Sequence, residues 1–253
     1  MRIAFLDSGI GGLSVLNAFL EKSYKNSNIK CSELSYFADF KNLPYGNKSK
    51  EELLEIIHKN FEYWHDKTDI IILACNTSSS LLTQEIKSKF PNLIIYSLLE
   101  GLEANLKQFS NSKENIAVFS TLATHNSESY IKICKQALGE DLNIQSIPCP
   151  KLVPFIENNL GNLNSKEGED LLLEYISLLN KKPDSLIFGC SHYTLMKNSF
   201  TKLLPETKLI DPGELLTILL KIDFSEYKFN AITSDNNQKE LNAKLIFFNK
   251  ELL

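Results

Sequence analysis

Short apolar runs alternate along this chain with longer stretches in which apolar residues recur every three or four positions. We expect the short runs to be β-strands and the longer stretches to be amphipathic helices. The expected strands occupy residues 3–6, 34–37, 70–74, 93–96, 116–119, 144–147, 185–188 and 208–210. The expected helices occupy residues 13–22, 50–65, 81–90, 99–108, 127–138, 152–159, 167–180, 195–204 and 214–221. Strands that alternate with helices predict an α/β fold with mostly parallel sheets.

Two segments about half a chain apart are similar to each other. Residues 67–77 read KTDIIILACNT and residues 182–192 read KPDSLIFGCSH, so that an Asp lies six positions before a Cys in both. Residues 3–8 (IAFLDS) and 116–121 (IAVFST) are also similar, and the two pairs are offset by 115 and 113 positions. This near-constant offset predicts two related α/β halves, although short apolar strands also resemble one another by chance.

The repeat predicts two pseudo-symmetric domains, each a mostly parallel sheet flanked by helices, with the active site in the cleft between them. We expect the first domain to comprise residues 1–96 with 208–253, and the second to comprise residues 97–207. In parallel α/β sheets, ligands bind beyond the carboxyl ends of the strands. Polar residues follow the expected strands at 7–9, 75–77, 120–124 and 190–192. We therefore expect these clusters to surround one cleft.

Cys75 and Cys190 occupy matching places in the two halves. Each ends an expected strand, and a helix is expected from about Leu81 in one half and from about Leu195 in the other. A thiol near a helix N-terminus is more readily ionised, and His192 lies two positions after Cys190. Racemisation at a carbon acid needs a base on one face of the substrate and an acid on the other, and two thiols can exchange these roles. The matched pair therefore favours two-thiol racemisation.

Other interpretations of the cysteines remain open. Both could be buried structural residues, as we expect for Cys31, Cys134 and Cys149. A hydrolase would use Cys190 as nucleophile and His192 as base, but it has no use for a second thiol in the mirrored position. The fragment Cys190-x-His192 has no second fragment with matching spacing, so we expect no metal site.

The loop after the first strand reads DSGIGG at residues 7–12. Its glycines allow backbone N–H groups to approach an anion closely. It lacks the Gly-Lys-Ser/Thr ending of a P-loop and the glycine spacing of a dinucleotide-binding loop, so a small carboxylate is a better candidate ligand than a nucleotide. We expect Asp7 to pair with a substrate ammonium group or to orient a thiol, and a tight turn capped by Asp7 is the alternative.

Composition argues against several functional classes. A formal net charge of −4, with both signs interspersed, provides no basic surface for nucleic acid. No apolar run reaches the length of a membrane span, and no signal-like segment follows the first residues MRIAFLD, so we expect a cytoplasmic protein. The five cysteines are odd in number in a chain of 253 residues, so we expect no disulfide framework.

Seven short motifs follow one another along the chain. They are DSGIGGLSV at 7–15, PYG at 44–46, ACNT at 74–77, TLAT at 121–124, LVPFIE at 152–157, GCSHY at 189–193 and IDPGE at 210–214. In these motifs the chain resembles the bacterial glutamate racemases of the cofactor-independent aspartate/glutamate racemase superfamily. Ser191 stands where that family usually has Thr, and Ser120 stands where it usually has Gly, but neither departure removes a proton-transfer group.

The resemblance implies an isomerase that interconverts L- and D-glutamate without a cofactor and supplies D-glutamate for peptidoglycan in the cell wall. It implies that the thiol of Cys75 acts on the D-enantiomer and that of Cys190 on the L-enantiomer. Asp7 and His192 would assist the thiols, with Glu157 as a further helper. The residues implied to hold the substrate are Asp7, Ser8, Tyr45, Gly46, Asn76, Thr77, Thr121, Thr124, Ser191 and His192.

Members of this family are often dimers, so the resemblance is compatible with a homodimer. Two alternatives to glutamate racemisation remain open. One is a racemase of aspartate or of another small amino acid, because pocket shape sets the length of the substrate. The other is a binding or regulatory protein that keeps the fold without turnover, since some members of the family also inhibit DNA gyrase. The presence of both thiols together with Asp7 and His192 favours an enzyme.

Overall fold

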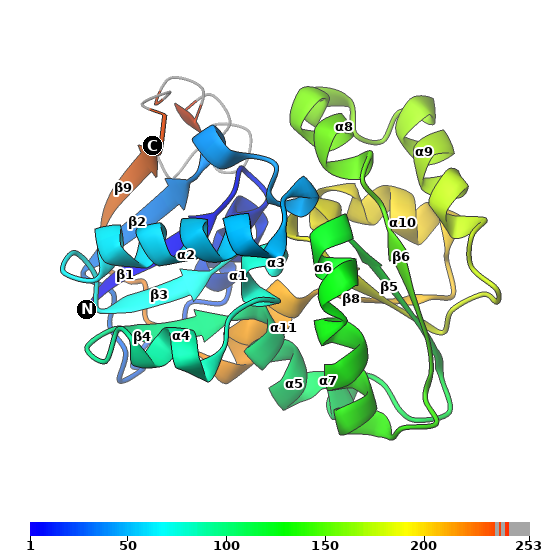
Figure 1. The fold of residues 1–253 in the computed structure, drawn as a ribbon, viewed down its shortest axis with the longest axis horizontal. Helices are drawn as coiled ribbons and strands as arrows, with labels where there is room; N and C mark the ends of the chain where they lie inside the picture. Colours follow the sequence, from blue (N-terminus) through cyan, green and yellow to red (C-terminus); the bar gives the residue numbers. More distant parts are fainter. Residues whose placement is uncertain (236–237, 239–240, 243–253) are drawn as a thin grey trace.

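The computed structural model describes residues 1–235, 238, 241 and 242, which contain two β-sheets (Figure 1). The first sheet has the strand order β4-β3-β1-β2-β9, and the second has the order β6-β5-β7-β8. The strands are β1 (Arg2–Asp7), β2 (Glu33–Ala38), β3 (Ile70–Leu73), β4 (Ile94–Ser97), β5 (Asn115–Ser120), β6 (Asn143–Pro148), β7 (Ser185–Gly189), β8 (Lys208–Ile210) and β9 (Lys228–Thr233). Every pairing between these neighbouring strands is parallel.

Helices cover both faces of each sheet. The α-helices are α1 (Gly12–Glu21), α2 (Lys50–Trp64), α3 (Asn76–Ser79), α4 (Gln84–Ser88), α5 (Leu98–Phe109), α6 (Leu122–Ser127), α7 (Ser129–Leu138), α8 (Leu152–Asn158), α9 (Lys166–Ile176), α10 (Lys197–Leu203) and α11 (Pro212–Leu219). The 3-10 helices are η1 (Phe40–Asn42), η2 (Tyr45–Asn47), η3 (Leu160–Asn162) and η4 (Ser191–Met196). Apolar side chains of α1 and α2 pack on opposite faces of the first sheet. The second sheet lies between α8, α9 and α10 on one face and α5, α7 and α11 on the other.

The strand order repeats between the two sheets. The series β4-β3-β1-β2 in the first sheet corresponds to β8-β7-β5-β6 in the second, and β9 is an additional strand. The Asp that precedes each matched cysteine bonds to the first residue of the corresponding strand, β1 in one half and β5 in the other. Asp69 accepts a hydrogen bond from the backbone N–H of Arg2 at 2.8 Å, and Asp184 accepts one from that of Asn115 at 2.7 Å. The prediction of two pseudo-symmetric parallel α/β domains is therefore confirmed.

The predicted domain boundary at residue 208 is wrong for the strand that begins there. β8 pairs with β7 in the second sheet, with Ile210 opposite Ile187, whereas the prediction placed residues 208–253 in the first domain. The chain rejoins the first sheet at β9, which pairs with β2. β9 is missing from the predicted strands because its sequence KFNAIT interrupts the apolar residues with Asn, and most of it is only half-buried. Residues 243–253 of the predicted first domain lie outside the described residues.

The predicted helix at residues 81–90 is shortened to α4 (Gln84–Ser88), and a separate short helix, α3 (Asn76–Ser79), precedes it. α3 begins directly after Cys75, and the hydroxyl of Ser78 donates to the carbonyl of Cys75 at 3.1 Å. Thr83 caps the second helix, α4, by accepting a hydrogen bond from the backbone N–H of Ile86 at 3.3 Å. The helical backbone therefore starts beside the thiol.

Two other predicted helices also begin earlier than expected. The stretch predicted at 127–138 is divided into α6 and α7 at Glu128, whose φ of 55° is left-handed. The stretch predicted at 195–204 begins as the 3-10 helix η4, directly after Cys190, and continues as α10. Both matched cysteines therefore have a turn of helix immediately after them.

Helices α5 and α11 pack against each other between the two domains (Figure 1). Gly101 lies at their closest approach, because a Cβ at this position would be 2.6 Å from the Cα of Leu216. The side-chain amide of Asn105 also donates to the carbonyl of Leu215 at 3.2 Å. This close contact joins the domains on one side of the cleft.

Candidate active site

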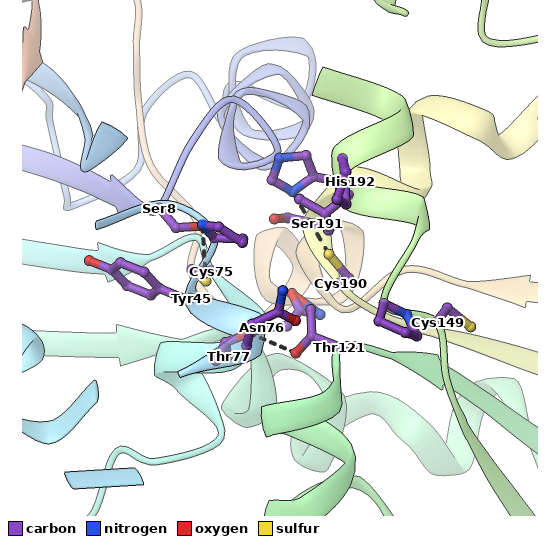
Figure 2. A pocket seen from close by; sticks show the side chains of 16 residues that line it. Ser8, Tyr45, Cys75, Asn76, Thr77, Thr121, Cys149, Cys190, Ser191 and His192 are labelled. Atoms are coloured by element: carbon purple, nitrogen blue, oxygen red, sulfur yellow. Dashed lines mark hydrogen bonds between the residues drawn. The ribbon is translucent and has the colours of Figure 1, made fainter. Parts of the chain in front are cut away.

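A cleft lies between the domains, and both Cys75 and Cys190 line it (Figure 2). Cys75 follows β3 and Cys190 follows β7, which are corresponding strands of the two sheets. Each of these residues is 5% exposed, so access to either thiol is through the cleft. Two thiols therefore face the same space from opposite domains.

The surroundings of Cys75 keep its thiol protonated. Its Sγ donates to the hydroxyl of Ser8 at 3.9 Å. Burial raises the pKa of the Cys75 thiol to about 12, and the nearby Asp7 carboxylate adds to the shift. A hydrogen bond from the backbone of Ser78 partly opposes it. At neutral pH, Cys75 is therefore a proton donor.

Cys190 has a different neighbour. Its Sγ lies 3.8 Å from Nδ1 of His192, and Nε2 of His192 lies 2.8 Å from Oε1 of Glu157. Burial by itself lowers the pKa of His192, but the hydrogen bonds with Cys190 and Glu157 outweigh it, so the pKa is raised well above its ordinary value. The imidazolium form is favoured, so the ring places a positive charge beside Sγ of Cys190. Cys190 is therefore placed to act as a base.

The glycine loop between β1 and α1 lies against this histidine and glutamate. The backbone N–H of Ile10 donates to Oε1 of Glu157 at 3.2 Å, so the loop binds a carboxylate of the chain itself. A Cβ on Gly9 would lie 2.4 Å from the same oxygen, and a Cβ on Gly11 would lie 2.3 Å from Nδ1 of His192. These glycines are required for the close approach of the two domains.

Asp7 lies behind the cleft, at the end of β1. Its carboxylate accepts hydrogen bonds from the backbone N–H of Gly9 at 2.9 Å and from the hydroxyl of Ser191 at 3.4 Å. Burial raises the pKa of Asp7, and the charge of His192 opposes part of that rise. The corresponding residue at the end of β5 is Ser120, whose buried hydroxyl has no hydrogen-bond partner among the described residues. The two halves therefore differ in charge at equivalent positions.

Replacing Asp7 with asparagine is expected to stabilise the fold at neutral pH and to lower activity by about a hundredfold. Because the pKa of Asp7 is raised, the stability linked to its proton is present below the ordinary Asp pKa and is lost as pH rises through the raised value. The neutral amide avoids this loss, so Asp7→Asn should unfold at a higher temperature than the wild type, with a gain that shrinks as pH falls. Thermal unfolding across a pH series measures the gain, and a variant less stable than the wild type at neutral pH contradicts this account.

Three threonine hydroxyls form a cluster across the domain boundary. Thr77 and Thr121 are 2.9 Å apart at their Oγ1 atoms, and Thr124 lies 3.0 Å from Thr121 and 3.3 Å from Thr77. Beside them, the amide nitrogen of Asn76 donates to the hydroxyl of Tyr130 at 2.8 Å and to a backbone carbonyl at 2.9 Å. The Oδ1 atom of Asn76 is buried without a partner in the described part of the chain. This wall therefore carries a cluster of hydroxyl groups, with a buried acceptor beside it that has no partner among the described residues.

The structure brings most of the predicted site residues to the cleft. Those that line it are Ser8, Tyr45, Gly46, Cys75, Asn76, Thr77, Thr121, Cys190, Ser191 and His192. Asp7, Thr124 and Glu157 do not line the cleft but bond to Ser191, Thr121 and His192, which do.

Several cleft residues were not among the predicted site residues. They are Pro44, Asn47, Cys149, Pro150, Val153 and Pro154. Cys149, expected to be structural, follows β6, and the rule that ligands bind beyond strand ends could have identified it. Its Sγ donates to the carbonyl of Ile147 at 3.4 Å, and burial raises its pKa.

Among the described residues, no three His, Cys, Asp or Glu side chains are grouped so that they could hold a metal ion. Within the same residues, no helix combines the length and the apolar character needed to cross a membrane.

Comparisons with known proteins agree with one another. A glutamate racemase from Prochlorococcus marinus (strain NATL1A) is 33% identical to the chain over 244 residues, which cover 95% of the chain and 86% of the relative. The crystal structure of a glutamate racemase from Campylobacter jejuni subsp. jejuni superposes with a TM-score of 0.85 at 26% identity, covering 99% of both chains. The structure of a glutamate racemase from Francisella tularensis in complex with D-glutamate has a TM-score of 0.79 at 26% identity, covering 98% of this chain and 93% of that one. No protein-family model matches the chain.

Proposed function

The chain belongs to the glutamate racemase family, and from this premise we propose that it interconverts L- and D-glutamate by proton transfer between the substrate Cα and two thiols. The observation that carries the proposal is that Cys75 and Cys190 line one cleft from corresponding strand ends of two related domains. An enzyme with a single nucleophilic thiol has no need of this second position. The thiols themselves carry the proton, so the proposed reaction uses no cofactor.

The surroundings of the thiols support Cys190 as the base and Cys75 as the acid at the start of the proposed reaction. Cys190, whose Sγ lies 3.8 Å from Nδ1 of His192, removes the Cα proton from one face of the substrate as a thiolate. The planar carbanion then receives a proton from Cys75 on the opposite face, which gives the other enantiomer. Afterwards Cys190 is a thiol and Cys75 a thiolate, so the reverse reaction can start. The sequence resemblance implies that the Cys190 face receives L-glutamate.

The remaining cleft groups suit an amino acid with two carboxylates. The hydroxyls of Ser8 and Thr77 can donate to carboxylate oxygens, and donors fixed before the reaction also stabilise charge that develops on the α-carboxylate. These contacts support a small acidic amino acid as substrate.

We propose a cytoplasmic role in which the D-glutamate formed is used for peptidoglycan synthesis. The sequence motifs shared with bacterial glutamate racemases support this role. The net charge of −4 gives no support to a nucleic-acid partner. A homodimer remains a proposal that rests on the same resemblance.

Circular dichroism of the purified protein with L-glutamate, and separately with D-glutamate, tests the proposal. In D2O without added cofactor, the signal of each enantiomer should decay to that of the racemate, with deuterium incorporated at Cα. A response to aspartate but not to glutamate would support the alternative racemase. No response to any amino acid would support a binding protein on this fold.

A further inference from the structure

One wall of the cleft is formed by the segment at residues 44–47, all of which line it. This segment belongs to the first domain but touches the second. A Cβ on Gly46 would lie 2.6 Å from the Cβ of Thr121, so only a glycine lets this backbone pack directly on the Thr121 side chain. The position of this segment therefore sets the width of the cleft beside the threonine cluster.

The hydroxyl of Tyr45 is committed to the protein and not to the cleft. It donates to Oδ2 of Asp39 at 2.6 Å and accepts a hydrogen bond from the side-chain amide of Asn60 at 3.1 Å. Burial, together with the Asp39 carboxylate, raises the pKa of Tyr45 well above its ordinary value, so the hydroxyl remains a donor. Tyr45 therefore lines the cleft through its other atoms and is anchored by its hydroxyl.

Asp39 is a buried carboxylate, 1% exposed, that comes directly after β2. Besides Tyr45, it accepts hydrogen bonds from the side-chain amide of Asn42 at 3.0 and 2.9 Å. Its backbone N–H donates to the carbonyl of Asp7 at 2.9 Å. It forms no ion pair within the described residues. Burying a carboxylate that is bound only by neutral donors costs free energy. A residue with a purely structural role could avoid this cost by having an uncharged side chain.

We infer that Asp39 is a positioning residue for the substrate: through Tyr45 it holds the segment at 44–47 against Thr121 at the separation that substrate binding needs. The inference rests on the proposed function, because it concerns the same cleft. Asp39 itself touches neither thiol in any hydrogen bond. Its loss should therefore weaken substrate binding more than it slows proton transfer.

The test compares Asp39→Asn and Tyr45→Phe with the wild type by measuring KM and kcat for both enantiomers of glutamate. Each variant should raise KM about tenfold and change kcat by less than about threefold, because a charge-assisted hydrogen bond is lost outside the reacting groups. The KM of the double variant should exceed that of either single variant by no more than about twofold, because both substitutions act on the same hydrogen bond. If Asp39→Asn does not fold, Tyr45→Phe still tests the inference, because it removes a single oxygen.

Asp223→Asn is the matched control. Asp223 is also a buried loop carboxylate, which accepts hydrogen bonds from the backbone N–H groups of Ser225 at 2.9 Å and Asn26 at 3.3 Å, and it does not line the cleft. Its variant should keep the wild-type KM. An unchanged KM in Asp39→Asn and Tyr45→Phe overturns the inference, as do effects that simply multiply in the double variant. A wild-type protein inactive on glutamate overturns the proposed function as well, whereas active wild type with unaffected variants overturns this inference alone.

Discussion

Replacing either Cys75 or Cys190 with serine is expected to lower the rate of glutamate racemisation by at least about a thousandfold while leaving the fold intact. Serine has nearly the same shape as cysteine, but its hydroxyl is a far weaker acid than a thiol. It therefore neither ionises to act as the base nor readily donates a proton to the carbanion. Racemisation measured by circular dichroism, with thermal unfolding as a check on folding, provides the comparison. Cys31→Ser is the control, because Cys31 is buried in the core of the first domain and does not line the cleft.

Isotope exchange adds a signature that loss of activity alone does not give. Each serine variant keeps one thiol facing one side of the substrate, so in D2O it should exchange the Cα proton of a single enantiomer without forming the other. The two variants should act on opposite enantiomers. Full racemisation by Cys75→Ser would contradict the two-thiol mechanism and favour the hydrolase interpretation, which makes no use of Cys75.

Gly11→Ala is expected to lower kcat/KM by about a hundredfold, because a misplacement of catalytic groups by about 1 Å has a cost of that size. The added Cβ would lie 2.3 Å from Nδ1 of His192 and 2.6 Å from the hydroxyl of Ser191. His192 is fixed by Glu157 on its other side, so the clash must push the loop and the second domain apart. Steady-state kinetics with both enantiomers measures the loss.

Gly161→Ala is the matched control for this substitution. Gly161 lies in η3, where an added Cβ meets no atom within 4 Å. It should therefore leave both activity and stability unchanged. Wild-type kinetics in Gly11→Ala would show that the two domains do not need the approach seen here.

The apolar runs predicted the strands well because a buried parallel strand is a continuous apolar segment. The eight predicted strands correspond to β1 to β8. β9 was not predicted because it is a half-buried edge strand, which has no continuous apolar run. The partner of β8 also could not be predicted, since the pairing of a strand depends on the path of the chain between sheets and not on the three residues of the strand.

The site was predicted where it follows from strand ends and missed where it depends on side-chain direction. Cys75 and Cys190 follow strands, and both line the cleft. By contrast, the sequence resemblance assigned Tyr45 to the substrate, and nothing in the motif PYG indicates that its hydroxyl turns away to Asp39. A contact between residues six apart in a loop is set by tertiary packing, which the sequence pattern alone does not specify.

Asp7 and Ser120 end corresponding strands, yet one is a carboxylate and the other a hydroxyl. For a racemase, thermodynamics limits the effect that this difference between the halves can have on the kinetics. Mirror-image amino acids have the same free energy in water, so the equilibrium constant is unity, and the quotient kcat/KM must be equal for the two enantiomers whatever surrounds each thiol. The unlike halves cannot bias the reaction toward one hand. They can only change kcat and KM in proportion, so that the quotient stays the same for both enantiomers. The enantiomer with the higher kcat is therefore also the one with the higher KM.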